Sequence, residues 1–123
     1  TVNSYTLRPE RDAFADWFET AGRPILIGEH HFPLESSRQV QPPYPAFNAD
    51  ERNKCYRDYL LYWAKQPWSL GAHWFQYVDQ PGTGRADGEN QIIGWVDITD
   101  EPHGDLVDAL QETRAKLFET LFS

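Results

Sequence analysis

The sequence predicts an α/β domain in which two buried parallel strands are joined by a helix. Residues 25–27 are three branched aliphatic residues that follow Pro24 and precede Gly28. A short apolar run between turn residues is typical of a strand buried on both faces. A second run, residues 70–77, also begins apolar and ends polar, and a helical pattern separates the two runs. This order forms a βαβ unit, so the polar ends of both strands should meet at one edge of the sheet.

The first helix is expected before this unit, over residues 10–21. Gly22 suits the end of that helix, and Pro24 follows two residues later, as is common after a C-cap. Residues 1–9 are expected to be an irregular lead-in. The helix is indicated by apolar side chains at helical spacing, which are Phe14, Trp17, Phe18 and Ala21.

The connection between the two strands contains a long loop and a helix. Residues 30–49 are rich in proline, and a loop of this length is usually functional or disordered. Asn48 and Glu51 form a capping-box pattern, which predicts a helix from there to about Gln66. One face of this helix should carry the apolar side chains of Tyr56, Tyr59, Leu60 and Trp63.

The last part of the chain predicts a loop, a short extended piece and a helix. Residues 79–90 are dense in glycine and charge, but no Lys-Ser/Thr pair ends the run and no helix follows directly, so a phosphate-binding loop is not predicted. Residues 92–96 suggest an extended piece. Asp100 is the expected N-cap of the last helix, with Pro102 in its first turn. That helix carries Leu106, Leu110, Leu117 and Leu121.

Composition narrows the classes of partner. The net charge is −8 and basic residues do not cluster, so nucleic-acid binding is not expected. No run approaches the roughly 18 apolar residues of a membrane-spanning helix, and no signal peptide is visible at the N-terminus. Aromatic residues make up 15% of the chain, which fits either a large aromatic core or a surface that stacks on sugar rings.

Two strands alone cannot form a parallel sheet with both faces covered. The strand at residues 24–29 needs a neighbour on its other side. We therefore expect residues 1–123 to be a single partial domain of a larger α/β structure, or a homo-oligomer that completes the sheet. A β/α barrel typically needs about 250 residues, and this chain has 123.

Several motifs at these strand ends carry a family resemblance. They are Gly28-Glu29-His30-His31-Phe32, the run from Gly71 to Tyr77, and the groups Thr83-Gly84-Arg85 and Asp87-Gly88-Glu89-Asn90. Together they resemble the C-terminal end of β-agarases and related agarase-like glycoside hydrolases, which use a (β/α)8 TIM-type barrel. The His-Trp-Phe-Gln-Tyr run with the downstream groups is specific, whereas the Gly-Glu pair alone is weak. The resemblance covers about residues 23–110.

The resemblance implies that residues 24–29 and 70–77 are barrel strands seven and eight. Glu29 would then be the nucleophile of a retaining hydrolase acting on β-galactosidic linkages, with the acid/base on strand four, outside this chain. Such hydrolysis needs two carboxyl groups about 5–5.5 Å apart, so this chain alone is expected to be inactive. The partner would be an oligo- or polysaccharide, the location extracellular or periplasmic, and no cofactor is implied.

The remaining candidate residues would contact the substrate. In the resembled family, a tryptophan at the end of strand eight forms the bottom of the sugar-binding site. Trp74 would be this residue, and an unusual peptide bond would join it to Phe75. His31 and His73 would hydrogen-bond Glu29 or sugar hydroxyls, or else be structural histidines. Hydroxyl binding is also expected of Gln76, Asp79, Gln80, Arg85, Glu89 and Asn90, although the last three could equally form an ion-pair and turn network within their loop.

Two other classes of protein remain open. A zinc site could draw on Glu29, His30, His31, His73 and Asp79. However, adjacent histidines on a strand point to opposite faces and no His-Glu-x-x-His spacing occurs, so no metal site is predicted. The other alternative is a non-catalytic carbohydrate-binding or interaction domain. Its unpaired sheet edges would then pair in a dimer that completes the sheet.

Overall fold

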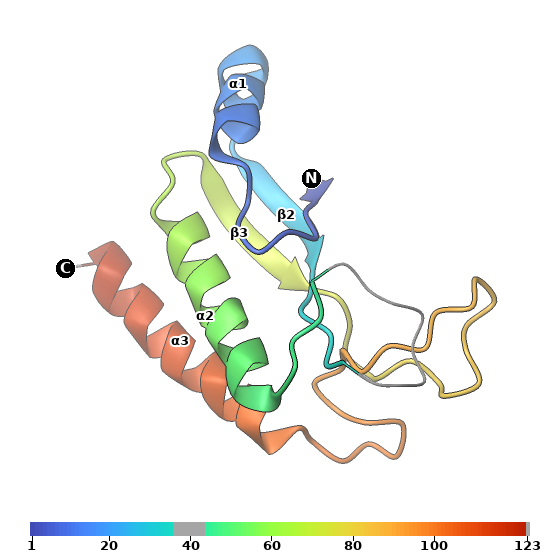
Figure 1. Cartoon of the computed structure of the whole chain (residues 1–123). Helices are drawn as coiled ribbons and strands as arrows, with labels where there is room; N and C mark the ends of the chain where they lie inside the picture. Colours follow the sequence, from blue (N-terminus) through green and yellow to red (C-terminus); the bar gives the residue numbers. More distant parts are fainter. Residues whose placement is uncertain (36–43, 123) are drawn as a thin grey trace.

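The computed structural model describes residues 1–35 and 44–122. They form a parallel sheet with helices packed against it (Figure 1). The three strands lie side by side in the order β1-β2-β3. The α/β class and the βαβ unit are therefore confirmed. The elements in chain order are β1 (Val2–Asn3), α1 (Arg11–Ala21), β2 (Ile25–His30), α2 (Ala49–Ala64), β3 (Ser69–Trp74) and α3 (Gly104–Phe122).

The start of the chain is not an irregular lead-in, and that prediction was wrong. Val2 pairs in parallel with Ile27, Asn3 pairs with Glu29, and the strand pairing extends to a hydrogen bond of 3.0 Å from Ser4 N–H to the Glu29 carbonyl. β1 thus supplies a neighbour for β2 that the sequence analysis expected to lie elsewhere. Two residues are too few to show any periodicity, so this strand had no signal in the sequence.

The helix ends follow the local chemistry of the sequence. Gly22 adopts a left-handed conformation with φ of 60° and donates a hydrogen bond to the Phe18 carbonyl, which ends α1 as expected. The side chain of Asn48 accepts a hydrogen bond of 2.8 Å from Glu51 N–H and begins α2. The Glu51 carboxylate accepts from Phe47 N–H rather than from Asn48 itself.

The core lies between β2 and α2. Ile25 and Ile27 of β2 are buried against aromatic residues of α1 and α2. Helices α2 and α3 lie side by side and run opposite to the strands (Figure 1). A buried arginine joins them, because Arg52 donates to the Asp105 carboxylate at 2.8 Å. The aromatic core residues are Phe14, Phe32, Tyr56, Tyr59, Trp63 and Trp68.

Several element boundaries differ from the sequence predictions. β3 ends at Trp74 and not at residue 77, and α2 ends at Ala64, before Gln66. Asp100 does not cap the last helix: it has φ of 67°, and α3 begins at Gly104.

The turn before α3 is organised by Asp97, which explains the later start of that helix. The Asp97 carboxylate accepts hydrogen bonds from the N–H groups of Thr99 and Glu101. Pro102 forms an isolated bridge with Val96 and so lies outside the helix. Residues 92–96 contain only isolated bridges and no strand. Within the described residues no helix is long and apolar enough to cross a membrane.

Candidate active site

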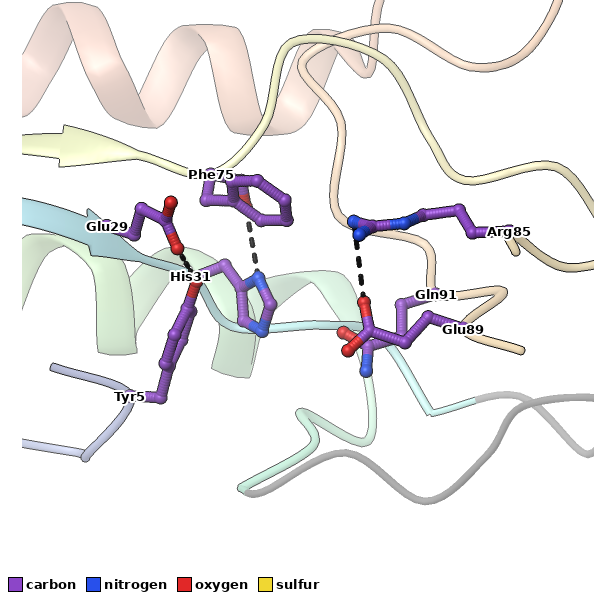
Figure 2. A pocket seen from close by; sticks show the side chains of 7 residues that line it. All are labelled: Tyr5, Glu29, His31, Phe75, Arg85, Glu89 and Gln91. Atoms are coloured by element: carbon purple, nitrogen blue, oxygen red, sulfur yellow. Dashed lines mark hydrogen bonds and ion pairs between the residues drawn. The ribbon is translucent and has the colours of Figure 1, made fainter. Parts of the chain in front are cut away.

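A pocket of about 300 Å³ opens where the strands end (Figure 2). One lining residue follows β1, one lies near the end of β2 and one directly follows that strand, one follows β3, and three come from the loop before α3. This is the edge at which the sequence predicted that polar groups would meet. The lining residues are Tyr5, Glu29, His31, Phe75, Arg85, Glu89 and Gln91.

Glu29 is held by a tyrosine that the sequence analysis did not select. The Tyr5 hydroxyl donates a hydrogen bond to Oε2 of Glu29, and Figure 2 shows the two side chains meeting at the edge of the pocket. Burial and this hydrogen bond both raise the pKa of Tyr5 well above its usual value. The hydroxyl therefore stays protonated and acts as a donor to the carboxylate. β1 brings Tyr5 here, and the failure to predict that strand explains the omission.

The two adjacent histidines face opposite sides of the sheet, as strand geometry requires. His31 faces the pocket and lies 4.6 Å from the Tyr5 ring, between ring centroids. His30 faces α2 and stacks on Tyr59 with centroids 4.5 Å apart and an interplanar angle of 2°. Burial lowers the pKa of His30 to about 4, so this histidine is neutral in the folded protein.

His31 is fixed as one tautomer of the neutral ring. Its Nδ1 lies 3.0 Å from the Phe75 carbonyl oxygen, which can only accept a hydrogen bond. Nδ1 therefore carries the proton. Burial lowers the pKa of His31, which favours the uncharged ring. A neutral His31 protonated at Nδ1 has Nε2 as a hydrogen-bond acceptor.

Phe75, and not Trp74, lines the pocket. The cis peptide bond joins Phe75 to Gln76, so the expected unusual bond between Trp74 and Phe75 was placed one residue too early. β3 ends at Trp74, whose Nε1 donates to the Ile93 carbonyl at 2.7 Å. Because successive side chains alternate across a strand, Phe75 faces the opposite side.

Trp74 and His73 instead line a neighbouring depression, together with His30. Trp74 packs there against Trp95, with ring centroids 5.2 Å apart. The backbone carbonyl of His73 lies 2.9 Å from Nδ1 of His30, whose ring faces α2 and not the pocket that holds Glu29. The structure thus does not bring the His73 or Trp74 side chains to the pocket that holds Glu29.

The wall opposite Glu29 is a charged loop. Arg85 forms ion pairs with Asp87 at 2.7 Å and with Glu89 at 3.6 Å. Its guanidinium carbon lies 5.8 Å from the centroid of the Phe75 ring. Arg85 and Glu89 form the ion-pair network that the sequence offered as one alternative, and both also line the pocket, while their contact with a substrate stays a prediction.

The other predicted residues lie outside this pocket and stabilise the loop. Gln76 donates to the Val78 carbonyl at 2.8 Å. Asp79 is buried and binds both Gly94 N–H, at 2.6 Å, and His103 Nε2, at 2.8 Å. Asp79, Gln80 and Asn90 line a separate depression. Only Glu29, His31, Arg85 and Glu89 of the ten predicted site residues therefore line the pocket.

Gln91 is a further pocket residue that the sequence analysis missed. It lies in a polar stretch without periodicity, and nothing in the sequence distinguishes it from its neighbours. The residues considered as zinc ligands do not converge. Within residues 1–35 and 44–122, no group of three or more His, Cys, Asp or Glu side chains could hold a metal ion.

The chain is similar in sequence and in structure to parts of known enzymes. No family model matches the chain. The chain is 41% identical over 116 residues to β-agarase B of Vibrio sp. (strain JT0107), covering 90% of the chain and 12% of that protein. It is 36% identical over 129 residues to β-agarase A of the same strain, covering 97% of the chain and 13% of that protein. The solved structure of an exo-β-agarase matches 98% of the chain with 36% identity and a TM-score of 0.86, covering 16% of that structure.

These similarities place the chain with the glycoside hydrolases. More narrowly, the chain is homologous over nearly its whole length to a segment of the β-agarases. It spans only 12–13% of the length of the two Vibrio relatives. The expected family resemblance is therefore confirmed.

Proposed function

We propose that this chain is the C-terminal part of a retaining, agarase-like glycoside hydrolase in which Glu29 is the nucleophile. The observation that carries the proposal is the position of Glu29, at the end of a central strand, in a pocket, with its carboxylate held by Tyr5. The substrate is a polysaccharide with β-galactosidic linkages. Enzymes of this kind act on polymers outside the cytoplasm, so the location is extracellular or periplasmic.

The rest of the enzyme completes the sheet. β1 and β3 are the edges of the described sheet, and Leu70 on β3 is 65% exposed. An apolar pocket of about 330 Å³ lies beside this edge, between α2, β3 and α3. In the proposed assignment β2 and β3 are strands seven and eight of a (β/α)8 barrel, and the preceding part of the barrel covers these surfaces.

The exposed edge also supports the alternative, in which the chain is an interaction or carbohydrate-binding domain without catalysis. In that case a second copy of the chain covers Leu70 and the adjacent groove. The long relatives favour the barrel, because most of their length lies outside the matched segment. Sedimentation of this chain alone and of a longer form separates the two: a dimer of the short chain with a complete sheet would support the alternative.

The chemistry follows from the position of Glu29. Its carboxylate attacks the anomeric carbon, the glycosidic bond breaks, and an acid from the other part of the barrel protonates the leaving oxygen. Water, deprotonated by that same group, then cleaves the glycosyl–enzyme ester. The Tyr5 hydrogen bond holds the attacking carboxylate in one orientation. Phe75 provides an apolar surface for the sugar, and His31 accepts a hydrogen bond from a hydroxyl group.

Substitution of Glu29 in the enzyme that contains this chain tests the proposal. Glu29→Ala should lower kcat on an aryl β-galactoside by about 10⁴-fold or more, because the covalent intermediate cannot form. Sodium azide should restore product formation and give an α-galactosyl azide, since azide attacks from the face that Glu29 leaves empty. Glu19→Ala, on the exposed side of α1, is the control. Full activity of Glu29→Ala, or no azide product, would contradict the assignment.

A further inference from the structure

We propose that the pocket wall formed by Glu89 and Gln91, held in place by Gln80, binds the hydroxyl groups of an uncharged sugar and rejects a sugar that carries a sulfate or carboxylate group. The proposal rests on the proposed function, because it concerns the substrate of the same pocket. It assigns a specificity role to Glu89 and Gln91 and a positioning role to Gln80.

Gln80 fixes the two wall residues through both ends of its side-chain amide. Its Nε2 donates to Oε2 of Glu89 at 2.8 Å, and its Oε1 accepts from Gln91 N–H at 2.7 Å. Its backbone N–H also donates to the Gln91 carbonyl at 3.1 Å. Gln80 is only 3% exposed, so it acts through its neighbours and not by touching the substrate. The wall is therefore built before a ligand arrives.

The wall presents hydrogen-bond acceptors. Gln91 is 4% exposed, lines the pocket, and its buried Oε1 has no partner in the described parts of the chain. A buried acceptor without a partner is costly, and a ligand that donates to it removes that cost. Figure 2 shows the Gln91 amide beside the Glu89 carboxylate, on the opposite side of the pocket from Glu29.

These acceptors suit the hydroxyl groups of a neutral sugar. A hydroxyl group can donate to a carboxylate, to an amide oxygen or to the unprotonated nitrogen of His31. A sulfate ester or an ionised carboxylate offers only acceptor oxygens. Such a group would leave Gln91 Oε1 unpaired and would place its own oxygens against the oxygens of Glu89.

The charges around the pocket also favour a neutral sugar over an anionic one. Among the described residues that line the pocket, the cation is Arg85, and it already pairs with Asp87 at 2.7 Å and with Glu89 at 3.6 Å. Glu29 adds a further carboxylate to the lining. His31 is uncharged when its ring is in the form described above. Within the described lining, carboxylates thus outnumber cations, and an anionic substituent would meet like charges.

The test compares two oligosaccharides with the enzyme that contains this chain: a neutral agaro-oligosaccharide and the same oligosaccharide with one galactose 6-sulfate. The wild-type enzyme should have a kcat/KM at least about 10-fold higher on the neutral sugar, because a like charge in the pocket is unfavourable. Glu89→Gln removes one negative charge and should reduce this ratio several-fold. Glu19→Gln on α1 carries the same change of charge far from the pocket and should leave the ratio unchanged.

A second variant adds a negative charge to the wall, where Glu89→Gln removes one. Gln91→Glu adds a negative charge at the same wall and should increase the ratio of neutral to sulfated turnover. A wild-type preference for the sulfated sugar that Arg85→Gln abolishes would overturn the proposal, because Arg85 would then bind the anion. Equal ratios for the wild type, Glu89→Gln and Gln91→Glu would also overturn it.

Binding measurements separate this proposal from the assignment of the nucleophile. In Glu29→Gln, calorimetry with the two oligosaccharides should still show tighter binding of the neutral sugar. If Glu29→Gln retains full turnover, the proposed function fails. The ratio of the affinities for the neutral and the sulfated oligosaccharide then still tests whether the wall selects a neutral sugar. If turnover is lost but both sugars bind equally, the nucleophile stands and the specificity proposal fails.

Discussion

Tyr5 and Glu29 meet across 24 positions of the chain, with the tyrosine hydroxyl donating to Oε2 of the carboxylate. The contact exists because the short strand β1 pairs with β2 and carries the next residues of the chain over the end of that strand. Burial and the nearby carboxylate keep the hydroxyl protonated by raising the pKa of Tyr5. The pair therefore acts as a fixed donor and acceptor at the edge of the pocket.

Removing this hydroxyl should weaken catalysis more than folding. A hydrogen bond to a charged group contributes about 1.5–3 kcal/mol, so Tyr5→Phe should lower kcat by about 10- to 100-fold. The reason is that the Glu29 carboxylate loses the group that orients it. Steady-state kinetics on an aryl β-galactoside measures the effect, and the melting temperature reports on folding. An unchanged kcat in Tyr5→Phe would show that the contact has no role in the reaction.

Phe75 and Trp74 should give separable effects. Phe75 lines the pocket, so Phe75→Ala should raise KM by about 10-fold or more through the loss of stacking on the sugar. Trp74 packs against His30, Tyr56 and Trp95 and donates to a backbone carbonyl. Trp74→Leu should therefore lower the melting temperature. Kinetics and thermal unfolding of both variants decide this, and the reverse pattern would restore the tryptophan as the sugar-binding residue.

His30 should make stability depend on pH. The pKa of this residue is lowered from 6.5 to about 4 by burial, so the folded state binds the proton less well than the unfolded state. The stabilisation is fully present above pH 6.5 and is lost as the pH falls from 6.5 towards 4. The shift corresponds to about 3 kcal/mol. In urea unfolding at pH 7 and pH 4, His30→Phe should lose less stability between the two values than the wild type, whereas equal losses would argue against a buried neutral His30.

Gly94 should tolerate no side chain. A Cβ at this position would lie 2.3 Å from the backbone nitrogen of Asp79 and 2.3 Å from the backbone oxygen of Val96. Gly94→Ala must push the backbone segments at Asp79 and Val96 apart, at a cost of about 1–3 kcal/mol or more. Gly82→Ala is the matched control, because nothing lies within 4 Å of its Cβ. Equal melting temperatures for the two variants would contradict the packing seen at Gly94.

The sequence predicted those parts of the fold whose signals are local. The apolar run before Gly28 identified β2, and Gly22 and Asn48 marked helix ends that the structure confirms. β1 could not be predicted, because it is only two residues long and is defined by its pairing with β2. Asp100 was chosen as a cap from its residue type, whereas Asp97 forms the turn through three-dimensional contacts.

The site was predictable where a strand sets the direction of a side chain. The end of β2 placed Glu29 and His31 correctly at one pocket. The end of β3 was predicted three residues too late, which obscured the fact that Phe75 lies beyond the strand. In the loop, composition could not show that Gln80 is buried behind the wall while Gln91 lines the pocket, because that difference depends on hydrogen bonds formed only in the fold.

Covalent trapping tests the central claim most directly. The enzyme that contains this chain would be treated with a 2-deoxy-2-fluoro-β-galactoside that carries a good leaving group, then digested and analysed by mass spectrometry. A retaining enzyme should accumulate the fluoroglycosyl ester, and the modified peptide should carry it on Glu29. An ester on another carboxylate, or hydrolysis with inversion and no trapped ester, would contradict the assignment of Glu29 as the nucleophile.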